Sequence, residues 1–478
     1  MKLLVLLFAL ALRAQQTDAS ISGVVTDKTG AAVPNAEVTA TQLETSRATF
    51  VRSNEAGFYS LRPLPIGTYV VSVKLDGFKV HRQDGVVLTT GQSLELNVAM
   101  EPGAVSDAVT VTAEVPLLES RTAEASQLIE SKTIEDMPMG DRRAMNIVEI
   151  TGATVFIPSE TGGSPTFSLA GGRAGSQMFW IDGGAGQNMR LGVASTNWDP
   201  PIETLQEIKI MGNGFSAEFG ASAGGVVIAN TKSGTTKFKG ALFEYFRNQV
   251  LDAPNYFSPI IDGAKQRPAL RYNAFGGTIG GPIRKDRTFF FLAYEGSRRG
   301  DGTIRTLTVP SDLERRGDFS RTENARGLAV VYDPSTTRRN AANAIIRDPF
   351  PSNIVPSNRI DPIAAKLVPF FPVANRGADD RTGANNFRLN DVNRTTRSNY
   401  TLKLDHTLND KNKLLYRLLW SDDVSARSSV YPNPAADTVN QSNGTVAFHY
   451  GAWTRLVSPT VINELRATYG DRTFRSFA

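Results

Sequence analysis

Residues 399–421 read NYTLKLDHTLNDKNKLLYRLLWS, and this stretch decides the fold of the chain. Apolar and polar side chains alternate from Asn399 to Leu408, and after the turn at 409–412 they alternate again up to Ser421. Successive side chains of a strand point to opposite faces of a sheet, so this pattern predicts two antiparallel strands joined by a short turn. Each strand has about ten residues and one apolar face, as β-strands that cross a membrane do.

The same alternation occurs in five further segments, at 238–247, 271–279, 287–296, 444–456 and 461–470. Together with the first pair they predict about seven strands. The connections between these strands are alternately long and short. A sheet threaded through a membrane has this order, because short turns lie on one side and long loops on the other. A soluble sandwich has no reason to keep it.

The composition of the 478-residue chain excludes several kinds of chemistry. There is no cysteine, which excludes disulfide scaffolds, thiolate metal sites and cysteine nucleophiles. The three histidines, His81, His406 and His449, are too far apart in the sequence to suggest a histidine-rich metal centre. A net charge of +5 is too dilute over this length to indicate nucleic-acid binding. Since no nucleophile motif is present, we expect neither an enzyme nor a bound cofactor or metal.

The first 14 residues have the pattern of a secretory signal peptide. Lys2 precedes an apolar run from Leu3 to Leu12, which is too short to span a bilayer, and Ala14 is a candidate cleavage site. The alternative is a buried N-terminal helix. No other stretch approaches the roughly 18 apolar residues of a membrane-spanning helix. We therefore expect an exported chain that enters a membrane only as a β-barrel.

Residues 20–102 contain short strands separated by turn residues, which is the pattern of a β-sandwich. The strands are expected at 21–27, 33–40, 54–59 and 64–73. Gly30, Gly57 and Gly67 lie where hairpin turns need positive φ. The side chains expected between the sheets are Phe58, Leu61, Tyr69, Val71 and Val73.

This order of turns and core positions resembles the carboxypeptidase regulatory-like domain, a transthyretin-like sandwich. The resemblance implies the fold of residues 20–102 but no peptidase activity, since His81 alone cannot form a zinc triad. Two roles remain open for this domain. We favour a periplasmic spacer, and glycan binding is the alternative because related folds include carbohydrate-binding modules.

Residues 103–118 are expected to be a linker that carries a short strand-forming segment. This segment is Asp107-Ala108-Val109-Thr110-Val111-Thr112-Ala113, an acidic residue followed by alternating β-branched residues. Such a segment can add to the edge of a partner sheet through main-chain hydrogen bonds. It resembles the TonB box of outer membrane receptors, which implies a TonB-type energy-transducing protein of the periplasm as partner. A plain linker and an edge strand of the sandwich remain alternatives.

Residues 119–235 contain a series of motifs, at 137–143, 167–173, 178–184, 202–210 and 216–235. In this order they resemble the plug domain of TonB-dependent receptors. Structural roles in its turns are assigned to Asp182, Gly183, Glu218, Gly220, Gly224 and Gly225. A phosphate-binding loop is not supported, because no G-x-x-x-x-G-K-[ST] motif occurs. An acid–base pair of Asp182 and Glu218 is not favoured either, since nothing in the sequence brings the two together.

Residues 236–478 contain three longer motifs: FEYFRN at 243–248, GGTIGGPIRKDRTFFF at 276–291 and RDPFPSNIVP at 347–356. These resemble the barrel of Oar-like TonB-dependent receptors. The resemblance implies a barrel in outer-membrane lipid, a periplasmic N-terminal domain, and a long outer loop at 297–398, which is rich in Pro, Asn and Arg. It also implies an extracellular ligand, which is an oligosaccharide, a peptide or a siderophore and not a nucleic acid.

The predicted fold class is mostly β, with an N-terminal β-sandwich, an α+β plug and the antiparallel transmembrane strands of an incomplete barrel. Receptors of this kind close with about 22 strands, which would need on the order of 700 residues after position 236. The last residues, 475–478, also lack the aromatic end typical of the family. We therefore expect an N-terminal fragment of a larger receptor. The alternative is an exported carbohydrate- or peptide-binding module carried on a surface scaffold.

Overall fold

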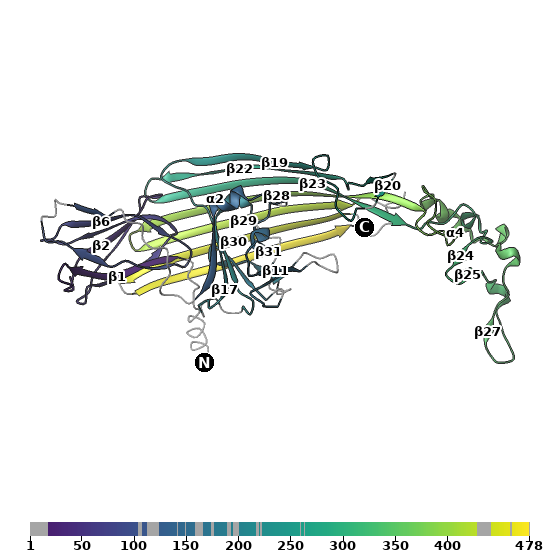
Figure 1. The fold of residues 1–478 in the computed structure, drawn as a ribbon, viewed down its shortest axis with the longest axis horizontal. Coiled ribbons are helices and arrows are strands. Elements are labelled where there is room, and N and C mark those ends of the chain that lie inside the picture. Colours follow the sequence, from purple (N-terminus) through teal and green to yellow (C-terminus); the bar gives the residue numbers. More distant parts are fainter. Residues whose placement is uncertain are drawn as a thin grey trace.

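The computed structural model describes residues 18–477, except 104–107, 112–123, 141, 149, 158–165, 174–175, 189–192, 195–199, 217–218, 220–221, 259, 262, 428–440 and 459–460. Three parts follow each other along the chain (Figure 1): a small β-sandwich, an α+β unit between residues 124 and 231 that we call the plug, and a long antiparallel sheet that we call the barrel sheet. The expected signal peptide at 1–14 lies outside the described residues. The same holds for Asp107, Thr112, Ala113, Glu218 and Gly220.

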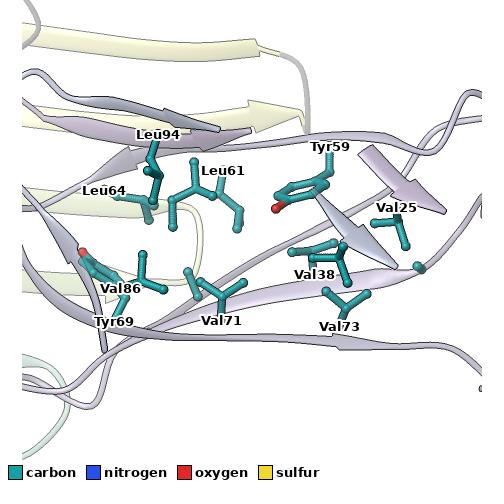
Figure 2. Close-up of a cluster of buried hydrophobic side chains, with 14 of the residues drawn as sticks. Val25, Val38, Tyr59, Leu61, Leu64, Tyr69, Val71, Val73, Val86 and Leu94 are labelled. Atoms are coloured by element: carbon teal, nitrogen blue, oxygen red, sulfur yellow. The ribbon is translucent and has the colours of Figure 1, made fainter. Parts of the chain in front are cut away.

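The sandwich consists of two sheets, one with the order β4-β1-β7, where β8 also pairs with β1, and one with the order β3-β2-β5-β6-β9. Its strands are β1 (Ala19–Asp27), β2 (Glu37–Gln42), β3 (Ala48–Arg52), β4 (Phe58–Leu64), β5 (Gly67–Lys74), β6 (Val80–Leu88), β7 (Ser93–Glu95), β8 (Val98–Met100) and β9 (Ala108–Val111). The apolar core lies between the sheets, where Leu61 from β4 and Val71 from β5 are both fully buried (Figure 2). This core is separate from the apolar cluster inside the plug.

The turn glycines of the sandwich adopt the conformations that the sequence predicts, with φ of +86° at Gly30, +72° at Gly57 and +142° at Gly67. Four of the five expected core side chains are buried, but the fifth, Phe58, is 42% exposed. Its neighbour Tyr59 is only 1% exposed. Because side chains alternate along a strand, the buried Tyr59 forces Phe58 toward solvent. The expected core position of Phe58 is therefore wrong.

The plug is built on a five-stranded sheet with the order β10-β17-β18-β13-β14, in which only β13 and β18 run parallel within the described residues. These strands are β10 (Ala125–Glu130), β13 (Met178–Ile181), β14 (Gly184–Ala185), β17 (Leu205–Asn213) and β18 (Val226–Thr231). Around them lie α2 (Ser131–Asp136), α3 (Ala144–Val148), η2 (Ile202–Thr204), β11 (Thr154–Ile157), β12 (Thr166–Leu169), β15 (Gln187–Asn188) and β16 (Val193–Ala194). Among the described residues, no helix is long and apolar enough to cross a bilayer.

The barrel sheet has seven antiparallel strands in chain order: β19 (Lys239–Asn248), β22 (Leu270–Arg284), β23 (Thr288–Leu307), β28 (Phe387–Asn409), β29 (Asn412–Arg427), β30 (Gln441–Ser458) and β31 (Val461–Phe477). Each corresponds to one strand that the alternation predicts. The plug lies against one face of this sheet, the inner face, and the sandwich lies at one end of the strands (Figure 1). In the described part of the chain, β19 and β31 are unpaired edges, so the sheet is not closed. The predicted fold class, including the incomplete barrel, is confirmed.

The long excursion between two barrel strands is shorter than the expected outer loop at 297–398. Strand β23 continues to Leu307 and β28 begins at Phe387, and the two stay paired up to these residues. The excursion is therefore 308–386, and it lies at the end of the sheet opposite the sandwich (Figure 1). It contains η3 (Glu314–Arg316), β24 (Glu323–Asn324), β25 (Gly327–Leu328), η4 (Pro334–Thr336), β26 (Arg338–Arg339), β27 (Ile345–Ile346), η5 (Pro351–Asn353), η6 (Ser357–Arg359), α4 (Pro362–Leu367) and η7 (Val368–Phe370). A smaller hairpin of β20 (Ile260–Ile261) and β21 (Ala264–Lys265) follows β19.

Candidate functional site: the plug anchored on the barrel sheet

The site begins at a tight turn that ends strand β13 of the plug. Asp182 has a φ of +46° and Gly183 a φ of +82°, both in the left-handed region, and β14 then returns along β13. Gly adopts this conformation freely and Asp more readily than most other residues, so the Asp-Gly pair suits the turn. The backbone N–H of Asp182 donates to the carbonyl of Ala229 on β18 (3.0 Å), which fixes the turn to the parallel neighbour strand. The turn thus places the Asp182 carboxylate beside Thr231, at the end of β18.

The carboxylate of Asp182 is buried and binds groups from both the plug and the barrel sheet. On the barrel side, Lys403 Nζ lies 3.2 Å from Oδ1 and Arg417 Nη1 lies 2.8 Å from Oδ2. On the plug side, Thr231 donates its backbone N–H to Oδ1 (2.8 Å) and its hydroxyl to Oδ2 (2.7 Å). Lys403 Nζ also donates to the carbonyl of Thr231 (2.9 Å). We call these four residues the plug anchor.

Electrostatics keep the central carboxylate of the plug anchor ionised. Burial by itself would raise the pKa of Asp182, but the charges of Lys403 and Arg417 and the two hydrogen bonds from Thr231 outweigh it and lower the pKa below the usual 3.8. The side chain of Arg417 is fully buried and that of Lys403 is 7% exposed, so both cations depend on this carboxylate for compensation. The anchor is therefore a structural ion cluster rather than an acid–base pair.

The plug turn approaches the barrel sheet so closely that a Cβ on either of its glycines would displace a barrel side chain. A Cβ on Gly183 would lie 2.7 Å from Nη1 of Arg466, and a Cβ on Gly184 would lie 2.9 Å from Cδ2 of Tyr450. Both contacts come from barrel strands, β31 and β30. The two glycines therefore let the plug backbone lie directly on the inner face.

A second contact joins the plug to the first barrel strand. Arg142 forms a buried ion pair with Glu203, and its guanidinium lies 3.7 Å from the ring centroid of Tyr245 on β19. Arg247, also on β19, donates to the carbonyl of Gly140 (2.6 Å). The segment 137–143, expected to lead into the first plug helix, thus contacts β19. The plug anchor uses other barrel strands, β28 and β29.

The sandwich contacts the plug through a buried turn at Thr90. Glu207 on β17 accepts hydrogen bonds from the backbone N–H of Thr90 (2.7 Å) and from its hydroxyl, and Asn230 donates to that hydroxyl. Burial raises the pKa of Glu207, and the hydrogen bonds from Thr90 offset this only in part. Arg47 extends the contact to the barrel sheet, where it donates to the carbonyl of Arg287 (3.1 Å). These bonds join all three parts of the chain.

A cavity of about 200 Å³ lies where the sandwich, the plug and the barrel sheet meet. Its charged lining comes from all three parts and includes Asp18, Arg47, Asp182, Lys403, Asp405, Lys413, Glu464 and Arg466. The lining therefore includes both acidic and basic groups. Within the described part of the chain, no group of three or more His, Cys, Asp or Glu residues is arranged to hold a metal ion.

The face of the barrel sheet opposite the plug carries apolar and aromatic side chains. Tyr294, Tyr400 and Trp420 lie in one row across three neighbouring strands, with successive ring centroids 5.0 Å apart. Tyr400 is 41% and Trp420 38% exposed. Aromatic rows of this kind lie at the lipid–water interface of membrane barrels. The outer face thus suits a bilayer. The inner face carries the cations of the plug anchor together with Leu419 and Phe448, which pack in the apolar cluster of the plug.

The structure distributes the predicted site residues over three places. Asp182 and Gly183 lie at the plug anchor, while Gly224 and Gly225 lie in the turn that leads into β18. Of the segment 107–113, the structure describes residues 108–111, which form strand β9 on the sandwich.

Four residues of the two plug contacts escaped the sequence analysis: Lys403, Arg417, Arg142 and Glu203. For the two barrel cations a signal exists. Lys403 and Arg417 are charged residues at polar positions in the middle of alternating strands, where a membrane barrel has its lumen. Arg142 and Glu203 carry no comparable signal.

Comparison with known proteins agrees with this geometry. Residues 230–477 match the family model of the outer membrane beta barrel domain, and residues 20–101 match that of the carboxypeptidase regulatory-like domain. A curated relative, the TonB-dependent transporter Oar of Myxococcus xanthus, is 26% identical over 313 residues. This match covers 62% of the present chain and 29% of Oar, so the chain spans less than a third of that relative. The resemblance to Oar-like receptors and to the regulatory-like domain is confirmed.

Solved structures of outer membrane transporters are also similar to this chain. The transporter YddB of Escherichia coli matches with a TM-score of 0.41 and 12% identity, over 73% of this chain and 38% of YddB. The ferric enterobactin receptor PfeA of Pseudomonas aeruginosa matches with a TM-score of 0.41 and 10% identity, over 73% of this chain and 41% of PfeA.

The barrel family model covers more than half of the chain and contains all seven strands of the barrel sheet. The chain therefore belongs to the outer membrane β-barrel family, and its place is the outer membrane.

Proposed function

We propose that this chain forms the N-terminal part of a TonB-dependent outer membrane receptor that imports an extracellular ligand. In this proposal residues 20–102 are a periplasmic domain, 103–118 a linker with a TonB box, 119–235 the plug, and 236–478 the first barrel strands. The observation that carries the proposal is the plug anchor. A sheet domain pinned by buried charges against the inner face of a barrel sheet obstructs the lumen until it moves.

Energy for this movement enters, in the proposal, through residues 107–113. A TonB-type periplasmic protein binds this segment by strand addition and pulls on the plug. The ligand is an oligosaccharide, a peptide or a siderophore, and it binds at the outer loops. Further strands pair with the free edges of β19 and β31, because unpaired backbone groups in lipid cost several kcal/mol each.

The experiment that tests this function uses the full-length protein in detergent and, as probe, the purified periplasmic domain of the TonB-type protein of the same organism. Deletion of Asp107–Ala113 is expected to weaken binding at least tenfold, which is about 1.4 kcal/mol. Deletion of seven residues from the exposed outer hairpin, 339–345, is the control and should leave binding unchanged. Equal binding by the wild type and the Asp107–Ala113 deletion would contradict the proposal.

Membrane extraction separates this function from the alternative of an exported binding module. A receptor stays in the outer membrane fraction and needs detergent for release. Release by salt or alkaline washing alone would favour the module. The same preparation also gives the mass of the native protein.

A further inference from the structure

Part of the segment 107–113, which the proposed function assigns to partner binding, is already a strand of the N-terminal domain. Residues 108–111 form β9, which pairs in parallel with β6 in the register Val80–Ala108, His81–Val109, Arg82–Thr110 and Gln83–Val111. This makes β9 the last strand of the sheet β3-β2-β5-β6-β9. The backbone that a partner strand would bind is therefore held extended.

The chain leaves the sandwich beside the start of β6, which explains why β9 pairs there. The backbone N–H of Lys79 donates to the carbonyl of Glu101 (2.8 Å), and that of Gly103 donates to the carbonyl of Gly77 (3.1 Å). The Glu101 carboxylate also pairs with Lys28 (3.0 Å) and Lys79 (3.5 Å). The exit of the chain is thus fixed only a few residues before β9 begins.

Strand β9 has two edges, and only one of them faces β6. No strand in the described part of the chain lies beyond β9 in the sheet order. The outer edge of an exposed strand presents a row of N–H and C=O groups, which is a template for a further strand.

The sheet next to β9 offers a solvent-facing surface as well as an edge. By strand register, Thr110 on β9 lies beside Arg82 on β6, which lies beside Ser72 on β5. Thr110 and Arg82 are exposed, and Nε of Arg82 lies 2.8 Å from Oδ1 of Asp84. A strand added to β9 would therefore continue this row of side chains.

We propose that the partner strand adds to the outer edge of β9 while β9 remains paired with β6, so that the sandwich and the partner form one continuous β-sheet. The identity of the partner as a TonB-type domain rests on the proposed function. A segment held in its bound conformation loses less conformational entropy on association than a flexible one, which favours binding in this arrangement. The sandwich is then part of the docking platform rather than a spacer.

The experiment locks β9 onto β6 with a disulfide in the full chain. Arg82→Cys together with Thr110→Cys places two thiols on neighbouring strands, where Cα atoms lie roughly 4.8 Å apart, within disulfide range. Because residues 1–478 contain no cysteine, the two substitutions introduce the only thiols of this stretch. The probe is again the purified periplasmic domain of the TonB-type protein. Its affinity is measured with the R82C/T110C variant oxidised and reduced.

The proposal expects the oxidised and reduced forms to bind with affinities within about threefold of each other. A larger loss on oxidation that the reductant restores would overturn it, because the partner would then need β9 released from β6. Absence of binding by both the reduced variant and the wild type would overturn the proposed function as well. The two failures are therefore distinguishable.

A matched pair controls for cross-linking of this sheet as such. Thr39→Cys with Phe50→Cys joins β2 to β3 at the opposite edge, where the structure pairs these two residues. Oxidation of this variant should leave the affinity unchanged. If it weakens binding as much as the R82C/T110C lock does, rigidity of the sandwich rather than release of β9 is limiting, which also contradicts docking on a fixed sheet.

Discussion

Arg417 and Asp182 are 235 residues apart in the sequence, and in the fold Nη1 of the arginine lies 2.8 Å from Oδ2 of the aspartate. The guanidinium of Arg417 also lies over the rings of Phe448 and Tyr450, 5.2 Å from each centroid. With Lys403 on its other oxygen, one carboxylate compensates two buried cations. A plug that moves away from the inner face must therefore bring water to these cations or leave them unpaired.

Replacing the anchoring carboxylate is expected to loosen the plug. Asp182→Asn keeps the size of the side chain and removes its charge, so Lys403 and Arg417 lose their buried counter-ion. Loss of one partner from a buried ion pair costs about 3–5 kcal/mol. Hydrogen exchange of the full chain in detergent, followed by mass spectrometry, should show faster exchange in β13 and β18.

An exposed ion pair of the same chemistry serves as the control. Arg338 and Asp348 in the outer excursion form two hydrogen bonds of 2.7 Å each, and both side chains are more than half exposed. Asp348→Asn should change stability by less than about 1 kcal/mol. Exchange in β13 and β18 that is equally slow in both variants and the wild type would show that the anchor contributes nothing.

The junction between the sandwich and the plug is expected to weaken as the pH rises. Burial raises the pKa of Glu207 above its usual 4.5, so the folded junction holds a proton more tightly than the separated parts do. The stabilisation is complete below pH 4.5 and is lost as the pH rises through the raised pKa. The Thr90 amide, which donates to Glu207, reports this directly through its exchange rate, corrected for the intrinsic effect of pH.

Glu207→Gln tests whether this carboxyl is the cause. The amide oxygen of glutamine still accepts from Thr90, but the group no longer titrates. Protection of the Thr90 amide should therefore be independent of pH in this variant, whereas Glu207→Ala should lose protection at every pH. A pH dependence that persists in the glutamine variant would assign the effect to another group.

The alternation of side chains was sufficient to find every barrel strand, because a period of two is local and each strand has one lipid-facing side. It failed at the outer ends of the strands. There, polar residues of β23 pair with polar residues of β28. The pairs include Arg298 with Thr396, Arg299 with Thr395, and Thr306 with Arg388. Beyond the bilayer both faces of a strand meet water, so alternation disappears although the hydrogen-bonded ladder continues.

The plug anchor could be predicted only in part. The Asp-Gly turn singles out Asp182 locally, but its barrel partners follow 221 and 235 residues later. No local pattern links such positions, because their contact depends on how the plug packs on the barrel sheet. Phe58 illustrates the converse problem. Two adjacent aromatic residues both suit a core, and only the register of β4 decides that Tyr59 is the buried one.

A glycine at the entrance to β18 is expected to be irreplaceable for steric reasons. Gly225 has a φ of +87°, and a Cβ there would lie 2.6 Å from Cδ2 of Leu169 and 2.7 Å from the carbonyl oxygen of Met211. Gly225→Ala should cost about 1–2 kcal/mol for the backbone conformation and a further 1–3 kcal/mol for overpacking. The sum of these two costs is measured by thermal unfolding in detergent, with protease cleavage within the plug as the readout.

Gly171 separates these two costs. Its φ of +77° is similar, but nothing lies within 4 Å of a Cβ built there. Gly171→Ala should therefore show only the backbone cost of about 1–2 kcal/mol. If the two variants unfold at the same temperature, the contacts with Leu169 and Met211 relax without cost and the steric explanation for Gly225 is wrong.

The sandwich offers a direct test of the register in β4. Leu61 is fully buried between the sheets, so Leu61→Ala should destabilise the domain by about 2–5 kcal/mol through lost burial and a cavity (Figure 2). Phe58 is 42% exposed on the same strand, and Phe58→Ala removes a larger side chain. Because Phe58 is 42% exposed and does not lie between the sheets, we expect a smaller cost, below about 1.5 kcal/mol. Hydrogen exchange in β1 and β5 of the full chain measures the destabilisation by each variant. If Phe58→Ala destabilises the domain as much as Leu61→Ala or more, β4 presents its other face to the core.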